Sequence, residues 1–145
     1  MKKQYELTVR VIEASLYVSK TKFFQMSVHV KLRMDAQDDK KTTTQSGQNP
    51  KWDETFVFPN IQKKSSIEFS VYHKSLFSSE ELIGNAIFVF QDLYSYNLKK
   101  HVTLHDPDNK EVGGLSLIIN LKSKQVPATV NVKVNSGGIE NSGKQ

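Results

Sequence analysis

The sequence contains no cysteine among its 145 residues. Disulfide bonds, thiolate metal ligands and a cysteine nucleophile are therefore excluded. The sequence also lacks an apolar run near the roughly 18 residues that a membrane-spanning helix needs. Residues 1–6 lead into an alternating polar pattern rather than an apolar signal core. We therefore expect a cytosolic protein.

Motifs of the common enzyme classes are missing as well. The sequence has no G-x-S-x-G, no H-E-x-x-H and no glycine-rich loop suited to cradling phosphate. His101 and His105 would lie roughly 13 Å apart on an extended segment, which is too far for one metal ion. We expect no enzymatic activity and no cofactor.

The residues that are present describe an ordinary globular domain with an uneven charge. Hydrophobic residues make up 37% and charged residues 24% of the chain, which carries a net charge of +5. Residues 1–41 hold nine lysines and arginines against five aspartates and glutamates. A basic region favours anionic partners, which include phospholipid headgroups, nucleic acid and acidic proteins.

Alternation of apolar and polar residues predicts short strands along most of the chain. In the clearest case Met26, Val28, Val30, Leu32 and Met34 face inward, whereas the residues between them face out. The predicted strands cover residues 6–14, 26–34, 40–46, 52–58, 67–71, 82–90, 101–104 and 115–121. The strand ending at Phe90 is apolar on both faces, so we expect it to be central in its sheet or packed on both sides. Residues 91–99 are expected to form a short helical turn.

This spacing predicts an all-β fold, an eight-stranded antiparallel β-sandwich that covers residues 1–124. The polar segment 125–145 is expected to be a disordered tail because it offers little apolar surface to bury. The alternative for this segment is an added edge strand through Val130, Val132 and Val134.

Four motifs resemble a known family. The stretch from Asn49 reads N-P-x-W-x-E followed by T-F-x-F, and its tryptophan is the only one in the chain. Together with L-T-V-R-V-I-E-A-S-L near the start, E-L-I-G-N-A-I-F and G-G-L-S-L-I-I-N-L, this stretch resembles C2 domains over residues 5–124. The resemblance implies a C2-like Greek key in the type II strand arrangement.

The same resemblance implies where calcium ligands would stand. The five aspartate positions of calcium-binding members fall on Thr21, Ser27, His73, Ser75 and Glu81. Only Glu81 is acidic, and Ca²⁺ prefers six to eight oxygen ligands with several carboxylates. We therefore expect no calcium binding. Glu80 and Glu81 are interpreted as an exposed loop pair rather than a weak ion site, and the acidic residues 35–39 as a solvated turn.

A basic stripe offers a different mode of binding. His29, Lys31 and Arg33 alternate on the outward side of one predicted strand, and Lys40 and Lys41 begin the next. The resemblance implies a phospholipid headgroup site at these two strands. We expect Lys31, Arg33 and Lys40 to share one face. The alternative is that these solvated charges only keep an exposed strand edge from aggregating.

Apolar residues in two predicted loops are the second candidate for membrane contact. They are Tyr17, Val18, Phe23, Leu76 and Phe77. Insertion of one or two of these side chains into lipid is one interpretation, and packing as caps over the core is the other.

The sequence thus predicts a monomeric, calcium-independent peripheral membrane module, cytoplasmic and located at membranes, that binds anionic phospholipid through the stripe and the loop tips. The alternative is a protein-interaction or scaffold module whose basic face meets an acidic protein partner. Nucleic-acid binding is not expected, because no aromatic and basic RNA-binding signature accompanies the charge.

Overall fold

The computed structural model describes residues 3–21, 25–35, 37–61, 65–76, 79–90 and 95–125. Within these ranges the chain forms strands and no helix. The strands are β1 (Lys3–Leu16), β2 (Ser27–Met34), β3 (Lys40–Lys41), β4 (Gln45–Ser46), β5 (Lys51–Ile61), β6 (Ser66–Lys74), β7 (Glu80–Val89), β8 (Tyr96–His105) and β9 (Glu111–Gln125).

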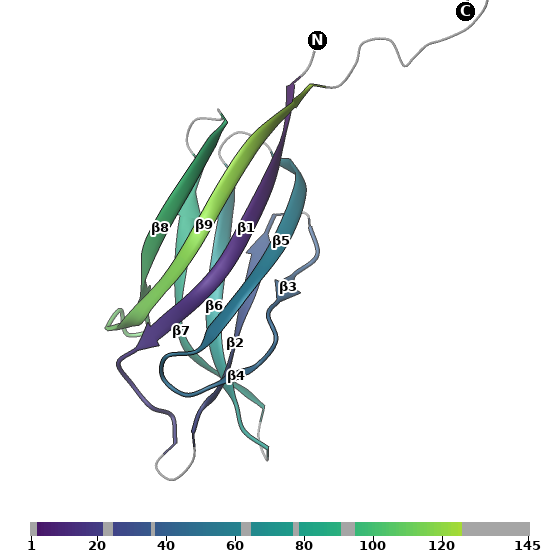
Figure 1. Cartoon of the computed structure of the whole chain (residues 1–145). Helices are drawn as coiled ribbons and strands as arrows, with labels where there is room; N and C mark the ends of the chain where they lie inside the picture. The colour runs from purple at the N-terminus through teal and green to yellow at the C-terminus, as the bar shows by residue number, and fades with distance from the viewer. Residues whose placement is uncertain are drawn as a thin grey trace, which may run out of the picture.

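The strands are arranged in two antiparallel layers. Their order is β3-β2-β6-β7-β8-β9-β1-β5, and β4 also pairs with β2. In Figure 1 the layer of β8, β9, β1 and β5 lies in front of the layer of β7, β6 and β2. Among the described residues, the two layers are joined by the pair Asn85 with His105, between β7 and β8. The predicted all-β sandwich is confirmed.

Gly84 allows the two layers to meet at this junction. A Cβ atom at this position would lie 2.6 Å from a methyl group of Val112 and 3.1 Å from the backbone oxygen of His105. The first distance is shorter than real Cβ contacts and the second is tight, so a larger residue at position 84 would require Val112 and the backbone at His105 to shift. The glycine that ends the motif E-L-I-G therefore has a packing role.

The core contains the inward residues of the alternating strands. Leu7, Val9 and Val11 on β1 are fully buried, and so are Val28, Val30 and Leu32 on β2. Trp52 is only 7% exposed and belongs to the same core cluster. The predicted inward residues are confirmed for both strands, whereas one residue predicted to face out on β2, His29, is buried.

The prediction of one continuous strand over residues 40–46 is wrong. This segment is split into β3 and β4, because Thr42 turns inward and bonds to β2 with both its backbone and its side chain. The Val30 amide donates to the Thr42 hydroxyl at 2.9 Å, and the Thr42 amide donates to the Val30 carbonyl at 2.9 Å. The next residue, Thr43, donates from its amide to both carboxylate oxygens of Glu54 on β5, at 3.2 Å each.

Two other predictions need correction. β7 is central in the strand order, between β6 and β8, but it is not packed on both faces, since Ile87 and Val89 on its outer face are 61% and 51% exposed. The second half of the predicted helical turn lies in β8, which begins at Tyr96 and pairs with β9. Residues 91–94 and the tail from residue 126 lie outside the described residues, so the division into sandwich and tail stays a prediction.

The connections are divided between the two ends of the sandwich. The β1–β2 and β6–β7 connections project from the same end, the lower one in Figure 1. Because β2 runs away from that end, the acidic turn at residues 35–39 lies at the other end. The predicted headgroup residues therefore lie on β2 and β3, and the described loop residues Tyr17, Val18 and Leu76 lie at one end of the molecule.

Candidate functional site

Strand β2 and its neighbours determine which cations share a face. In the antiparallel pair β2–β3, Lys31 stands opposite Lys41, and Leu32 stands opposite Lys40. Paired residues point to the same side of a sheet. Lys41 therefore shares the outer side with Lys31, and Lys40 shares the inner side with the buried Leu32. The prediction that Lys40 joins Lys31 and Arg33 on one face is wrong.

The surroundings of Lys40 agree with this register. Its ammonium nitrogen lies 5.3 Å from the centroid of the Phe58 ring, a cation–π distance. Phe58 is fully buried, so Lys40 covers the edge of the core with its stem. Lys41 is exposed instead. We name Lys31, Arg33 and Lys41 the basic face.

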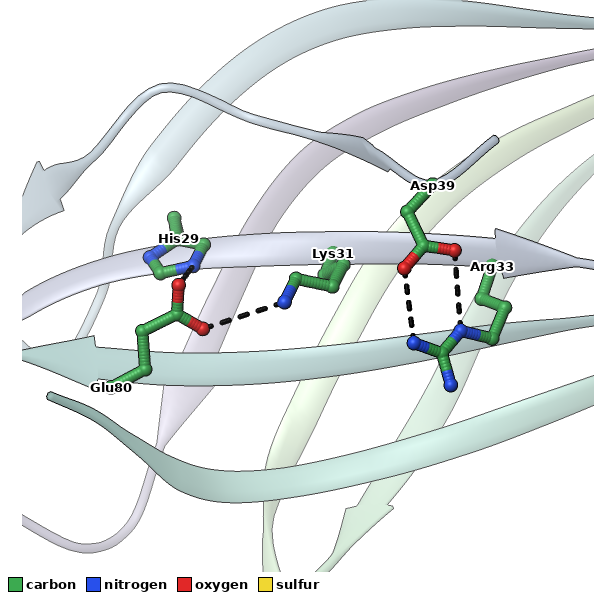
Figure 2. Close-up of polar contacts among 5 residues, drawn as sticks. All are labelled: His29, Lys31, Arg33, Asp39 and Glu80. Atoms are coloured by element: carbon green, nitrogen blue, oxygen red, sulfur yellow. Dashed lines mark hydrogen bonds and ion pairs between the residues drawn. The ribbon is translucent and has the colours of Figure 1, made fainter. Parts of the chain in front are cut away.

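Two cations of the basic face already have carboxylate partners within the chain. Arg33 donates from Nε to Asp39 Oδ1 at 3.2 Å and from Nη2 to Asp39 Oδ2 at 3.0 Å. The ammonium of Lys31 lies 3.5 Å from Glu80 Oε2. Figure 2 shows both pairs along one side of β2. The Arg33 guanidinium lowers the pKa of the exposed Asp39 carboxyl.

His29 differs from its neighbours on the strand. Its side chain is buried at 3% exposure, so the prediction that it faces solvent with Lys31 and Arg33 is wrong. The Tyr72 ring on β6 stacks on the imidazole, with centroids 5.5 Å apart and planes 19° from parallel. On its other side, His29 Nε2 lies 3.5 Å from Glu80 Oε1. Burial lowers the pKa of His29, and the nearby Glu80 carboxylate opposes this effect.

A shallow hollow of about 230 Å³ adjoins these residues on the outer face of β2, β6 and β7. It is lined by Lys31, Arg33, Glu68, Ser70, Tyr72, Leu82 and Asn85. Asn85 donates to Glu68 at 3.1 Å across its floor. The hollow therefore combines cations with an acidic group and an aromatic ring.

We name the end of the sandwich that carries the β1–β2 and β6–β7 connections the loop end. The apolar residues predicted for these two loops differ in their exposure. Leu76 is 94% exposed and Tyr17 is 61% exposed, whereas Val18 packs partly against the core. Phe23 and Phe77 lie outside the described residues. Exposure of Leu76 and Tyr17 is compatible with membrane contact, and the capping interpretation holds for Val18.

Residues at three of the implied calcium-ligand positions, His73, Glu81 and Thr21, contact other groups of the chain. His73 is buried and its Nδ1 accepts the Ser27 amide at 3.0 Å. Glu81 lies 3.7 Å from the ammonium of Lys20, which comes from the β1–β2 connection. Thr21 is partly exposed, and its backbone carbonyl accepts a hydrogen bond from the Ser19 hydroxyl. Ser75 is partly exposed after the end of β6.

Across the described ranges, no group of three or more histidine, aspartate and glutamate side chains is arranged to hold a metal ion. Among the same residues no helix could cross a bilayer. Calcium independence stays a prediction.

Sequence reasoning missed two residues that shape the basic face. Tyr72 and Glu80 contact His29 and Lys31 from β6 and β7, more than 40 residues away in sequence. No local pattern marks such contacts, because they depend on the pairing of distant strands.

Comparison with known proteins identifies the fold. The model of the C2 domain family matches residues 5–104, and the chain belongs to this family. C2 domains are modules that bind membranes or proteins, and a C2 domain alone is not catalytic.

Solved structures agree with this family at low sequence identity. A C2 domain of plant extended synaptotagmin 1 has a TM-score of 0.77 and 21% identity, over 87% of this chain and 100% of that one. Human GIVD cytosolic phospholipase A2 has a TM-score of 0.70 and 22% identity, over 81% of this chain and 16% of that one. CC2D1B has a TM-score of 0.68 and 24% identity, over 81% and 55%. At these identities the likeness concerns the fold alone.

Proposed function

We propose that the chain is a calcium-independent peripheral membrane module that binds anionic phospholipids. The observation that carries this proposal is the shared outer face of Lys31, Arg33 and Lys41 beside the hollow. The exposed side chain of Leu76 at the loop end supports the proposal, because the transfer of an apolar side chain from water into lipid is favourable.

The expected affinity is modest. Each cation near an anionic membrane contributes about 1 kcal/mol, and one inserted apolar side chain contributes about 1.5 to 3 kcal/mol. The gross binding free energy is then roughly 5 kcal/mol, which corresponds to a dissociation constant between millimolar and micromolar before association costs. Stable recruitment requires a second contact or several copies.

Other parts of the proposal follow from the same residues. Calcium is not needed, because Lys20 supplies a positive charge beside Glu81, the one acid at the implied ligand positions. The chain acts as a binding module without catalysis of its own, at the cytoplasmic surface of membranes. We also assign the type II arrangement, supported by β9 lying between β8 and β1.

A protein partner is the second candidate. Glu68, Glu80 and Asp39 lie among the cations of the outer face. A protein surface that carries both signs of charge matches this pattern better than a uniformly anionic one. The acidic groups of such a partner would engage Lys41 and Arg33, its basic groups would face the carboxylates, and lipid would then not be bound.

Vesicle sedimentation separates the two candidates. The wild-type protein is mixed with phosphatidylcholine vesicles, with and without phosphatidylserine or phosphoinositide, in the presence of a calcium chelator. We expect sedimentation only with the anionic lipids. Absence of sedimentation with every composition would reject the membrane proposal and favour the protein partner.

A further inference from the structure

Glu80 lies between two positively polarised groups of the outer face. Its Oε1 is 3.5 Å from His29 Nε2, and its Oε2 is 3.5 Å from the ammonium of Lys31. Figure 2 shows the carboxylate reaching both side chains from β7. Both distances exceed the 2.7 to 3.2 Å of an ordinary N–H···O hydrogen bond. The carboxylate therefore holds both groups electrostatically but satisfies neither.

The imidazole of His29 needs such an acceptor. Its Nε2 is buried and has no hydrogen-bond partner among the residues that the structure describes. A buried donor without an acceptor loses its hydration and gains nothing in return. In the tautomer that carries hydrogen on Nε2, Glu80 Oε1 at 3.5 Å is the carboxylate oxygen beside this N–H.

The neighbouring groups complete a site for an oxyanion. The ammonium of Lys31 lies 5.0 Å from the Tyr72 ring centroid, and the same ring stacks on His29. Tyr72 thus fixes the imidazole and the ammonium beside each other. The hollow, whose lining includes Lys31 and Tyr72, opens next to them. The imidazole Nε2 and the ammonium therefore both lie 3.5 Å from oxygens of one carboxylate, and Lys31 also lines the hollow.

We propose that His29 and Lys31 form an oxyanion site, that Glu80 fills it with its own carboxylate, and that the phosphate of a bound ligand displaces Glu80. This inference rests on the proposed function, in which the ligand is a phospholipid headgroup. A phosphate that enters from the hollow forms shorter, charge-assisted bonds than those of Glu80. Glu80 can leave because its side chain is 29% exposed at the first residue of β7. A ligand that binds His29 and Lys31 more weakly than the Glu80 carboxylate does will not displace it.

The variant Glu80→Gln tests the competition. With phosphatidylserine-containing vesicles in chelator, we expect its affinity to rise about fivefold, the factor that one freed cation contributes at an anionic surface. Glu111→Gln is the matched control, since it removes the same charge at an exposed position at the start of β9. In a Lys31→Gln background the gain from Glu80→Gln should disappear.

A second arm uses inorganic phosphate and needs no membrane. Titration of the Glu80→Gln protein with phosphate should shift the side-chain ¹⁵N resonances of His29, with smaller shifts in the wild type. This arm distinguishes free phosphate from a lipid headgroup, because a site that binds phosphate but no vesicle is not a lipid site.

The outcomes separate the inference from the proposed function. Vesicle binding that is equal in wild type and Glu80→Gln, without a phosphate shift at His29, overturns the oxyanion site and leaves the membrane function standing. A phosphate shift at His29 without vesicle binding by either protein supports the site and rejects the membrane function. A gain of the same size in Glu111→Gln overturns the site, because it reduces the effect to net charge.

Discussion

The basic face and the loop end differ in what a ligand must displace. On the basic face Arg33 is held by Asp39 and Lys31 by Glu80, so an incoming anion competes with carboxylates of the same chain. At the loop end Leu76 is 94% exposed, and a membrane displaces only water there. In the proposed function, the basic face would therefore contribute binding that depends on salt, and the loop end would contribute binding that does not.

Both regions depend on the same core, and Trp52→Ala tests it with the largest expected effect. The indole is 7% exposed, so its removal leaves a cavity at the start of β5. We expect the free energy of unfolding to fall by about 3 to 5 kcal/mol, as measured by urea denaturation. A loss below about 1 kcal/mol would mean that Trp52 is not a core residue.

Leu76→Ser tests the loop end. Because an inserted leucine acts through apolar burial, we expect vesicle binding to weaken about tenfold at low and at high salt alike. Leu98→Ser on β8, where the leucine is 39% exposed, is the matched control and should change little. A loss that vanishes at high salt would contradict the assignment of Leu76 to apolar contact.

The burial of His29 predicts how stability changes with pH. The folded protein lowers the pKa of His29, so the unfolded chain binds more protons between that lowered pKa and the ordinary value of about 6.5. The part of the unfolding free energy that depends on neutral His29 is therefore fully present above about pH 6.5, and it falls as the pH decreases through this window. The groups that face the imidazole are Tyr72, Glu80, Lys31, Lys41 and Lys74.

Thermal or urea unfolding between pH 5 and 8 checks this prediction. We expect His29→Gln to flatten the decline below about pH 6.5, the ordinary histidine value. His101→Gln, which changes an exposed histidine of β8, is the control and should keep it. An unchanged decline in His29→Gln would assign the pH dependence to other groups.

Calcium should have the smallest effect. Four of the five implied ligand positions are not acidic, and Glu81 already lies beside Lys20. We expect millimolar calcium to leave the melting temperature unchanged. A calcium-dependent rise of several degrees would contradict this and would place an ion at the loop end.

Local periodicity was enough to predict the inward core residues, and four motifs carried the resemblance to the family, but neither predicted the surface contacts. The inward set Val28, Val30 and Leu32 follows from a period of two within one strand. The face of Lys40 depends on the register between β2 and β3, and a shift of one residue moves a side chain to the opposite face. The sequence of the 35–39 turn does not determine that register.

His29 shows that an outward position on a strand does not ensure exposure to solvent. Its outward parity on β2 was predicted, yet Tyr72 and Glu80 from other strands cover it. A polar residue on an outward position can thus be buried by its cross-strand neighbours. The exposed Ile87 and Val89 on β7 are the reverse case, since apolar residues on both faces of a strand did not produce packing on both.

The most direct test of the proposed function is vesicle sedimentation of the triple variant Lys31→Gln, Arg33→Gln and Lys41→Gln in calcium chelator. Lys40→Gln is the control, because its side chain lies on the inner side against Phe58. We expect the triple variant to remain folded and to lose binding to phosphatidylserine or phosphoinositide vesicles, while Lys40→Gln binds like the wild type. Undiminished binding of the triple variant would contradict a membrane function of the basic face.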